Sequence, residues 1–168
     1  MKREIDDTIT TAYLETLLWS ETLVTDENEE GDRLTLTWEG SDYEEGTPLD
    51  QIIDVSDVED LAPDVWAEAK SDLEAFQGYC LDSIGIDPFA FFDASQVAHD
   101  FALSRNGHGA GFFDNTYRVT CIGPGARMPK PFDESISDDL QSAAKTFGTL
   151  GLMLWVDAEG NLKLESHG

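Results

Sequence analysis

The residue types best suited to chemistry gather in one glycine-rich segment, residues 100–114, which reads DFALSRNGHGAGFFD. Closely spaced glycines let backbone N–H groups approach a bound anion, and Arg105 and His108 add positive charge beside them. Arg105 would clamp the anion, and His108 would serve as an acid–base group because an unperturbed imidazole titrates at about pH 6.5. The residues of this candidate binding loop are Arg105, Asn106, His108 and Asp114.

The same segment also has a structural interpretation, as a tight turn that leads from a helix into a strand. The glycines would then adopt positive φ and His108 would pack against the fold. Arg105 would pair with an acidic neighbour, either Asp100 or Asp114. Neither the Walker spacing nor a Gly-x-Gly-x-x-Gly run after a strand is present, so a nucleotide-binding loop is not indicated. Ligand binding and a structural turn both stay open at this point.

Zinc or thiol chemistry would need the cysteines and histidines of the chain. Cys80 and Cys121 lie 41 residues apart, and neither Cys-x-x-Cys nor His-x-x-x-His spacing occurs. A thiolate at Cys121 activated by His99 or His108 has no local signature, and acidic surroundings raise a thiol pKa. Two cysteines are too few for a secreted disulfide framework, so we interpret both as reduced thiols of an intracellular protein, with one Cys80–Cys121 bridge as the alternative. We therefore expect no catalytic residue, no metal and no cofactor.

The strongest signal is the charge of the chain. Among 168 residues, 35 Asp and Glu face 10 Lys and Arg, which gives a formal net charge of −25. Residues 1–104 hold 27 acids and 4 bases, whereas residues 105–130 hold one acid and four bases. A mildly basic, glycine-rich island at 105–130 thus lies in an acidic molecule. Nucleic acid and anionic membrane surfaces would repel this charge, so direct binding to either is not expected.

The size of the acidic surplus matches that of duplex DNA. Because a duplex carries one charge per about 1.7 Å, 25 charges correspond to roughly 40 Å of duplex, and a compact chain of 168 residues spans about 40 Å. A solubilising surface and adaptation to a salt-rich cytoplasm are the competing explanations. A third explanation is that the protein mimics DNA. The carboxylates that would then stand in for phosphates are those of Asp26, Glu27, Glu29, Glu30, Asp42, Glu44, Glu45, Asp54, Asp57, Asp60 and Asp64.

Helical periodicity predicts the elements that would position these groups. Apolar residues recur at helical spacing over 6–19, after Pro63, over 94–104 and over 133–147. Asp93 is the expected N-cap of the third helix. These patterns predict four main helices.

Strand signals are shorter. Alternation over 34–38 predicts one short strand, and residues 112–113 and 117–122 are further strand candidates. Residues 152–156 and 161–164 flank a polar turn and predict a hairpin. Four helices packed with a small antiparallel sheet that includes this C-terminal hairpin make an α+β fold.

The chain is expected to form a single domain over residues 1–168, with acidic loops at 25–33 and 39–50. No apolar run reaches the roughly 18 residues of a membrane helix, and the acidic start lacks the apolar region of a signal peptide. We therefore expect a protein that acts in the cytoplasm.

Several stretches resemble a family of small acidic proteins of tailed phages. The matching stretches are residues 13–20, 48–50, 61–63, 100–114 and 143–148. Residues 100–114 carry the family core Asp-Phe-x-Leu-x-Arg-Asn-Gly-His-Gly-Ala-Gly-Phe-x-Asp, of which the Arg-Asn-Gly-His-Gly-Ala-Gly string is the most specific part. The family has no assigned activity, so the resemblance implies a virus-encoded protein acting in the cytoplasm of a prokaryotic host. Residues 31–40 and 115–132 are extra length relative to the family pattern.

Together these observations predict a non-enzymatic, phage-encoded accessory protein. It would bind a host or phage protein that normally binds DNA, using an acidic, DNA-mimic-like surface as antirestriction-type inhibitors do. The alternatives are a small-ligand-binding or catalytic protein that uses the loop at 105–114, and a structural or assembly protein of the phage.

Overall fold

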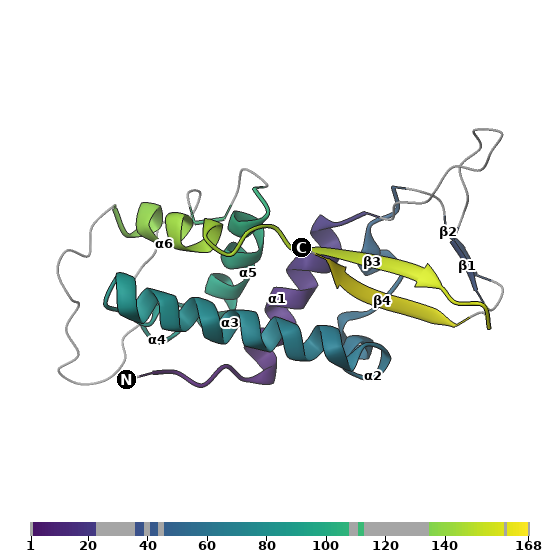
Figure 1. Ribbon diagram of the computed structural model, residues 1–168, viewed down its shortest axis with the longest axis horizontal. Helices are drawn as coiled ribbons and strands as arrows, with labels where there is room; N and C mark the ends of the chain where they lie inside the picture. Colours follow the sequence, from purple (N-terminus) through teal and green to yellow (C-terminus); the bar gives the residue numbers. More distant parts are fainter. Residues whose placement is uncertain are drawn as a thin grey trace.

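The fold is α+β, with a group of helices and, beside it, two small antiparallel sheets (Figure 1). The structure is a computed structural model that describes residues 2–22, 36–38, 41–43, 46–107, 111–112, 135–159 and 161–167. The predicted acidic loop at 25–33 and the strand candidate at 117–122 lie outside these residues.

The four predicted helices are confirmed, and for the three helices with both ends predicted the bounds lie within two residues of those expected. They are α1 (Asp7–Ser20), α3 (Pro63–Ser83), α5 (Ala94–Arg105) and α6 (Ser135–Lys145). Shorter pieces connect them, namely the 3-10 turns η1 (Leu49–Gln51) and η2 (Val55–Asp57) and the single-turn helices α2 (Val58–Leu61) and α4 (Pro88–Phe91).

Local chemistry explains where the helices begin. The carboxylate of Asp6 accepts a hydrogen bond from the backbone N–H of Ile9 at 3.0 Å and so caps α1. Asp93 does the same for α5, as predicted, by accepting from the N–H of Gln96 at 3.0 Å. Pro63 opens α3, where its missing N–H costs no helical hydrogen bond.

The core is built from aromatic side chains of α1, α3 and α5. The Phe76 ring of α3 stacks on the Phe101 ring of α5 with centroids 4.2 Å apart, and Tyr13 of α1 stacks on Phe101 at 5.4 Å. Phe89 meets Phe76 edge-on, and the Phe112 ring stacks on Phe76 with centroids 5.9 Å apart. All five side chains are fully buried, and each contributes on the order of 1.5–3 kcal/mol by leaving water. This cluster fixes α1 against α5, the main helix pair of the molecule.

The C-terminal hairpin is confirmed. Strand β3 (Gly151–Val156) pairs antiparallel with β4 (Leu162–His167), in a register that sets Val156 opposite Leu162. Leu152 and Leu154 are buried while the residues between and after them are exposed, which is the alternation that the sequence showed. The hairpin and α2 lie at the N-terminal end of α3, and α6 lies along its C-terminal half (Figure 1).

One loop prediction and one strand prediction need correction. Residues 39–50 were expected to be a loop, yet β1 (Leu36–Trp38) pairs with β2 (Ser41–Tyr43), and η1 begins before the segment ends. The sequence of β2, Ser-Asp-Tyr, has no apolar alternation, so only pairing across a short connection identifies it. Phe112, expected in a strand, lies in a turn against α5. No helix among the described residues is long and apolar enough to cross a membrane.

Candidate functional site

Arg105, the proposed anion clamp, is buried and engaged within the fold. Its guanidinium makes four hydrogen bonds, from Nε to the Gly148 carbonyl (2.9 Å), from Nη1 to the Tyr13 hydroxyl (2.8 Å) and to Asp72 Oδ2 (2.9 Å), and from Nη2 to the Phe147 carbonyl (3.0 Å). These bonds join the end of α5 to α1, α3 and the chain after α6. A guanidinium committed to partners inside the chain has little capacity left for a ligand.

Burial governs the electrostatics of this cluster. Asp72 is half-buried, and its desolvation raises the pKa of the carboxyl above its ordinary value, while Arg105 partly offsets the shift. Burial likewise raises the pKa of the Tyr13 phenol, so the hydroxyl stays neutral and accepts from the guanidinium. The expected pairing of Arg105 with Asp100 or Asp114 is corrected. Its acidic partner is Asp72, 33 residues earlier in the chain, which only the packing of α3 against α5 brings close.

The far end of the glycine-rich segment also has structural contacts. Gly111 has a φ of +104°, and a Cβ there would press against Ser104 Oγ and the carbonyl of Asp100. The N–H of Phe112 donates to Ser104 Oγ at 3.1 Å. At the near end, Asn106 Oδ1 accepts from the N–H of Leu150 at 2.7 Å. These contacts fit the turn interpretation of residues 104–107 and 111–112.

Two of the four candidate loop residues are thereby placed, and two are not. Arg105 is buried and Asn106 is half-buried at the end of α5. His108 and Asp114 lie outside the described residues.

The acidic residues named from the sequence divide in the same way. Asp26, Glu27, Glu29, Glu30, Glu44 and Glu45 lie outside the described residues, and Asp42 is placed in β2 with its side chain undescribed. Asp54, Asp57, Asp60 and Asp64 are described, and all four are exposed. With the exposed Glu59 they form what we call the acidic edge, which follows η2, α2 and the start of α3: Asp54, Asp57, Glu59, Asp60 and Asp64.

The acidic edge carries unpaired negative charge. Between residues 54 and 64 there are five acids and no base. Among described residues, Asp72 pairs with Arg105, Asp157 pairs with Lys163, and Asp100 contacts His99; none of these three carboxylates is in the edge. The N–H and hydroxyl of Ser56 donate to Asp54 Oδ1 at 2.9 and 2.8 Å, which lowers the pKa of this carboxyl and keeps it ionised.

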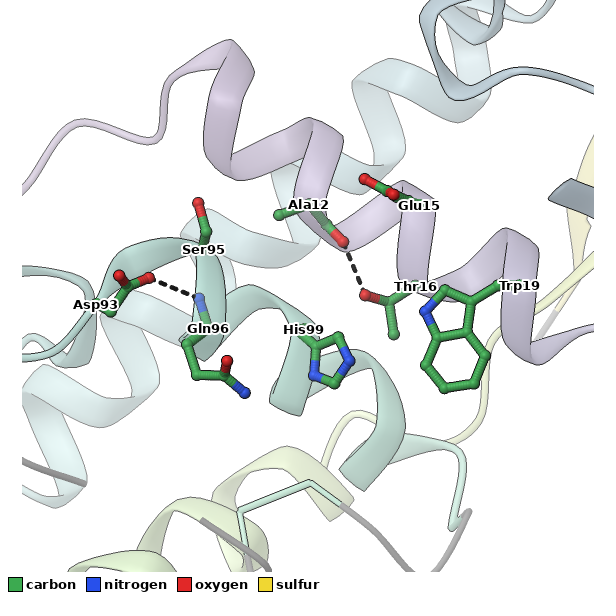
Figure 2. A pocket seen from close by; sticks show the side chains of 8 residues that line it. All are labelled: Ala12, Glu15, Thr16, Trp19, Asp93, Ser95, Gln96 and His99. Carbon is green, nitrogen blue, oxygen red and sulfur yellow. Dashed lines mark hydrogen bonds between the residues drawn. The ribbon is translucent and has the colours of Figure 1, made fainter. Parts of the chain in front are cut away.

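A groove between α1 and α5 was not identified from the sequence. It has a volume of about 440 Å³, and Figure 2 shows side chains of both helices around it. The lining residues are Ala12, Glu15, Thr16, Trp19, Asp93, Ser95, Gln96 and His99. The Trp19 ring is 45% exposed, and its centroid lies 6.0 Å from that of the His99 ring. The only sequence feature that could have indicated this groove is Trp19, a large aromatic residue near the polar end of a predicted helix.

A buried carboxylate organises one wall of this groove. Asp100 is fully buried, and its Oδ1 lies 3.0 Å from His99 Nδ1 and 3.0 Å from Gln96 Nε2. An ionised carboxylate oxygen only accepts hydrogen bonds, so both nitrogens donate to it. Asp100 thus fixes the orientation of two side chains that line the groove.

No metal or thiol centre is found in the described part of the chain. No group of three or more His, Cys, Asp or Glu residues there is arranged to hold a metal ion. Cys80 is a free cysteine in the core, and burial, with Asp87 nearby, raises the pKa of its thiol to about 12. Such a thiol is inert at neutral pH. Cys121 lies outside the described residues.

Comparison with known proteins adds no relative. No protein-family model, no curated protein and no solved structure matches the chain. The resemblance of residues 100–114 to the acidic phage proteins therefore stays a prediction, and what the protein does has to be inferred from its own residues.

Proposed function

We propose that this is a non-enzymatic, phage-encoded accessory protein that binds a DNA-handling protein of the host or phage through its acidic surface, as an antirestriction-type DNA mimic. The observation that carries the proposal is the acidic edge, whose exposed carboxylates have no basic partner among the described residues. A protein that normally binds phosphates would meet exposed negative charge there.

The charge balance of the whole chain supports the same function. With 35 acids and 10 bases, at least 25 carboxylates have no base with which to pair inside the molecule. Their mutual repulsion destabilises the compact state. A basic, DNA-binding surface on a partner would relieve the repulsion on contact. Direct binding to nucleic acid would increase it.

The ligand-binding alternative has lost one of its supports. Arg105 donates its hydrogen bonds to partners inside the fold, so it has little capacity left to bind an anion. The structural or assembly role in the phage remains the other alternative, and the presence of the protein in purified particles would favour it.

A displacement experiment tests the proposal. The purified protein is titrated into fluorescently labelled duplex DNA held by a restriction endonuclease, a repressor or a nucleoid protein, and anisotropy reports the released duplex. We expect the duplex to be released from at least one of these DNA-binding proteins. The affinity of our protein for that partner should fall tenfold or more from about 50 to about 200 mM salt, as it does in charge-dominated binding. At about 1 M salt, where the screening length is about 3 Å, release should be lost. Failure to release DNA from any of them at low salt, or release that is unchanged in high salt, would contradict the proposal.

A further inference from the structure

We propose that the groove between α1 and α5 binds the guanidinium group of an arginine side chain presented by a basic partner protein. The inference rests on the proposed function for the kind of partner, and on the groove alone for the chemistry that it recognises. It adds a specific contact to an interaction that would otherwise depend on diffuse charge.

The first argument is the aromatic surface. Trp19 stands at the end of α1 with nearly half of its side chain exposed, and the His99 ring lies beside it, tilted by 33° (Figure 2). A planar cation gains most from an indole face when it lies within about 6 Å of the ring centre. Guanidinium groups stack on such faces because they are flat and weakly hydrated.

The second argument is the hydrogen-bonding polarity of the wall. His99 and Gln96 each donate through one nitrogen to the buried Asp100 carboxylate. That leaves His99 Nε2 and the amide oxygen of Gln96, which are acceptors when the imidazole is neutral. The hydroxyl of Thr16 donates to the carbonyl of Ala12 at 2.8 Å, so its free lone pairs are acceptors as well. Gln96 and Thr16 therefore offer acceptors to whatever enters the groove, and His99 adds a third while its imidazole is neutral.

The third argument is charge. Glu15 and Asp93 contribute carboxylates to the lining, and none of the described lining residues is lysine or arginine. An anion would be repelled there. A nucleotide would carry phosphates into an acidic molecule, where they would be repelled. A guanidinium brings five donors, no acceptor and a permanent positive charge.

Arginine is a better match than lysine for the same reasons. A lysine ammonium is a compact, strongly hydrated charge that cannot stack and cannot span several acceptors with a rigid fork. A groove of this design should therefore distinguish two cations of equal charge, and the part of the preference that comes from stacking should depend on Trp19.

The test compares two short peptides of equal length and charge, one of alternating arginine and glycine and one of alternating lysine and glycine, by isothermal titration calorimetry. We expect the native protein to bind the arginine peptide about fivefold more tightly than the lysine peptide, as a partly exposed cation–π contact allows. Trp19→Ala should reduce the preference to less than twofold. Trp155→Ala, which removes another exposed tryptophan from β3, should leave the preference unchanged.

Equal affinities for the two peptides in the native protein, or a preference that survives Trp19→Ala, would overturn the inference. Because Trp19 is 45% exposed, the variant should fold, and its melting temperature verifies this. Neutralising the acidic edge should weaken the binding of both peptides and leave the ratio of their two affinities unchanged. The two proposals therefore fail in different experiments. If the proposed function is wrong, no DNA is displaced from any protein; if the groove does not bind arginine, the two peptides bind equally well.

Discussion

Replacing Arg105 tests whether this residue holds the fold together. Arg105→Ala removes four hydrogen bonds at once and leaves the buried Tyr13 hydroxyl and the Asp72 carboxylate without their guanidinium. Breaking a buried charge pair by removing one partner costs about 3–5 kcal/mol. The Asp72 side chain is 24% exposed, so water takes over part of its solvation and the expected loss is near the lower limit, about 3 kcal/mol. That loss raises the unfolding equilibrium constant roughly 150-fold.

Urea unfolding followed by tryptophan fluorescence measures this loss. We expect a lower midpoint with an unchanged slope, because the variant exposes the same surface on unfolding. Arg105→Lys keeps the charge but not the planar fork, so it should recover only part of the stability. Lys145→Ala, which removes an exposed base from the end of α6, is the matched control and should change stability by less than about 0.5 kcal/mol. An Arg105→Ala variant as stable as the native protein would refute the structural role and return Arg105 to the list of ligand-binding candidates.

Three further outcomes are expected from local geometry. Gly111→Ala should cost about 2–4 kcal/mol, measured by urea unfolding, because the new Cβ meets Ser104 in a backbone conformation with positive φ; an effect below about 0.5 kcal/mol would contradict the close contact. Asp157 accepts hydrogen bonds from the N–H groups of Asn161 and Glu159, which lower the pKa of its carboxyl in the folded state. Its contribution to stability should therefore be present above the ordinary value of 3.8 and be lost as pH falls through the lowered pKa, so that Asp157→Ala destabilises at neutral pH and not in strong acid. In a Cys121→Ser variant, the Cys80 thiol should react with a disulfide reagent only as fast as the protein unfolds; rapid labelling of the native state would contradict its burial.

Periodic elements could be predicted from the sequence because their signals are local. The stripe of apolar residues along α3, the Asp93 cap of α5 and the alternation in β3 each depend on residues within one element. Strand β2 could not be predicted, since its three residues carry no pattern without the partner strand.

Contacts between distant residues could not be predicted. The partner of Arg105 is 33 residues away, and the local acids Asp100 and Asp114 were the only ones that the sequence suggested. The groove combines Trp19 with His99, which are 80 residues apart, and acquires its polarity from a carboxylate that is hidden in the core. Composition predicted that acid dominates the surface, but the position of the acidic edge depends on how η2, α2 and α3 follow one another.

The central claim is that acid at a particular place on the surface engages a DNA-binding partner. Two variants that each neutralise four exposed carboxylates distinguish the effect of carboxylate position from the effect of total charge on binding. The edge variant carries Asp57→Asn, Glu59→Gln, Asp60→Asn and Asp64→Asn and spares Asp54, whose carboxylate caps η2. The control variant carries Glu74→Gln, Asp82→Asn, Asp138→Asn and Asp139→Asn.

The concentration of each variant that releases half of the labelled duplex from the responsive DNA-binding protein is the decisive quantity. With about 0.4 kcal/mol lost for each of four exposed charge contacts, the edge variant should need roughly 15-fold more protein than the native chain. The control variant should need less than threefold more. Equal losses for the two variants would show that only total charge matters, and no loss for either would show that the carboxylates do not meet the partner at all.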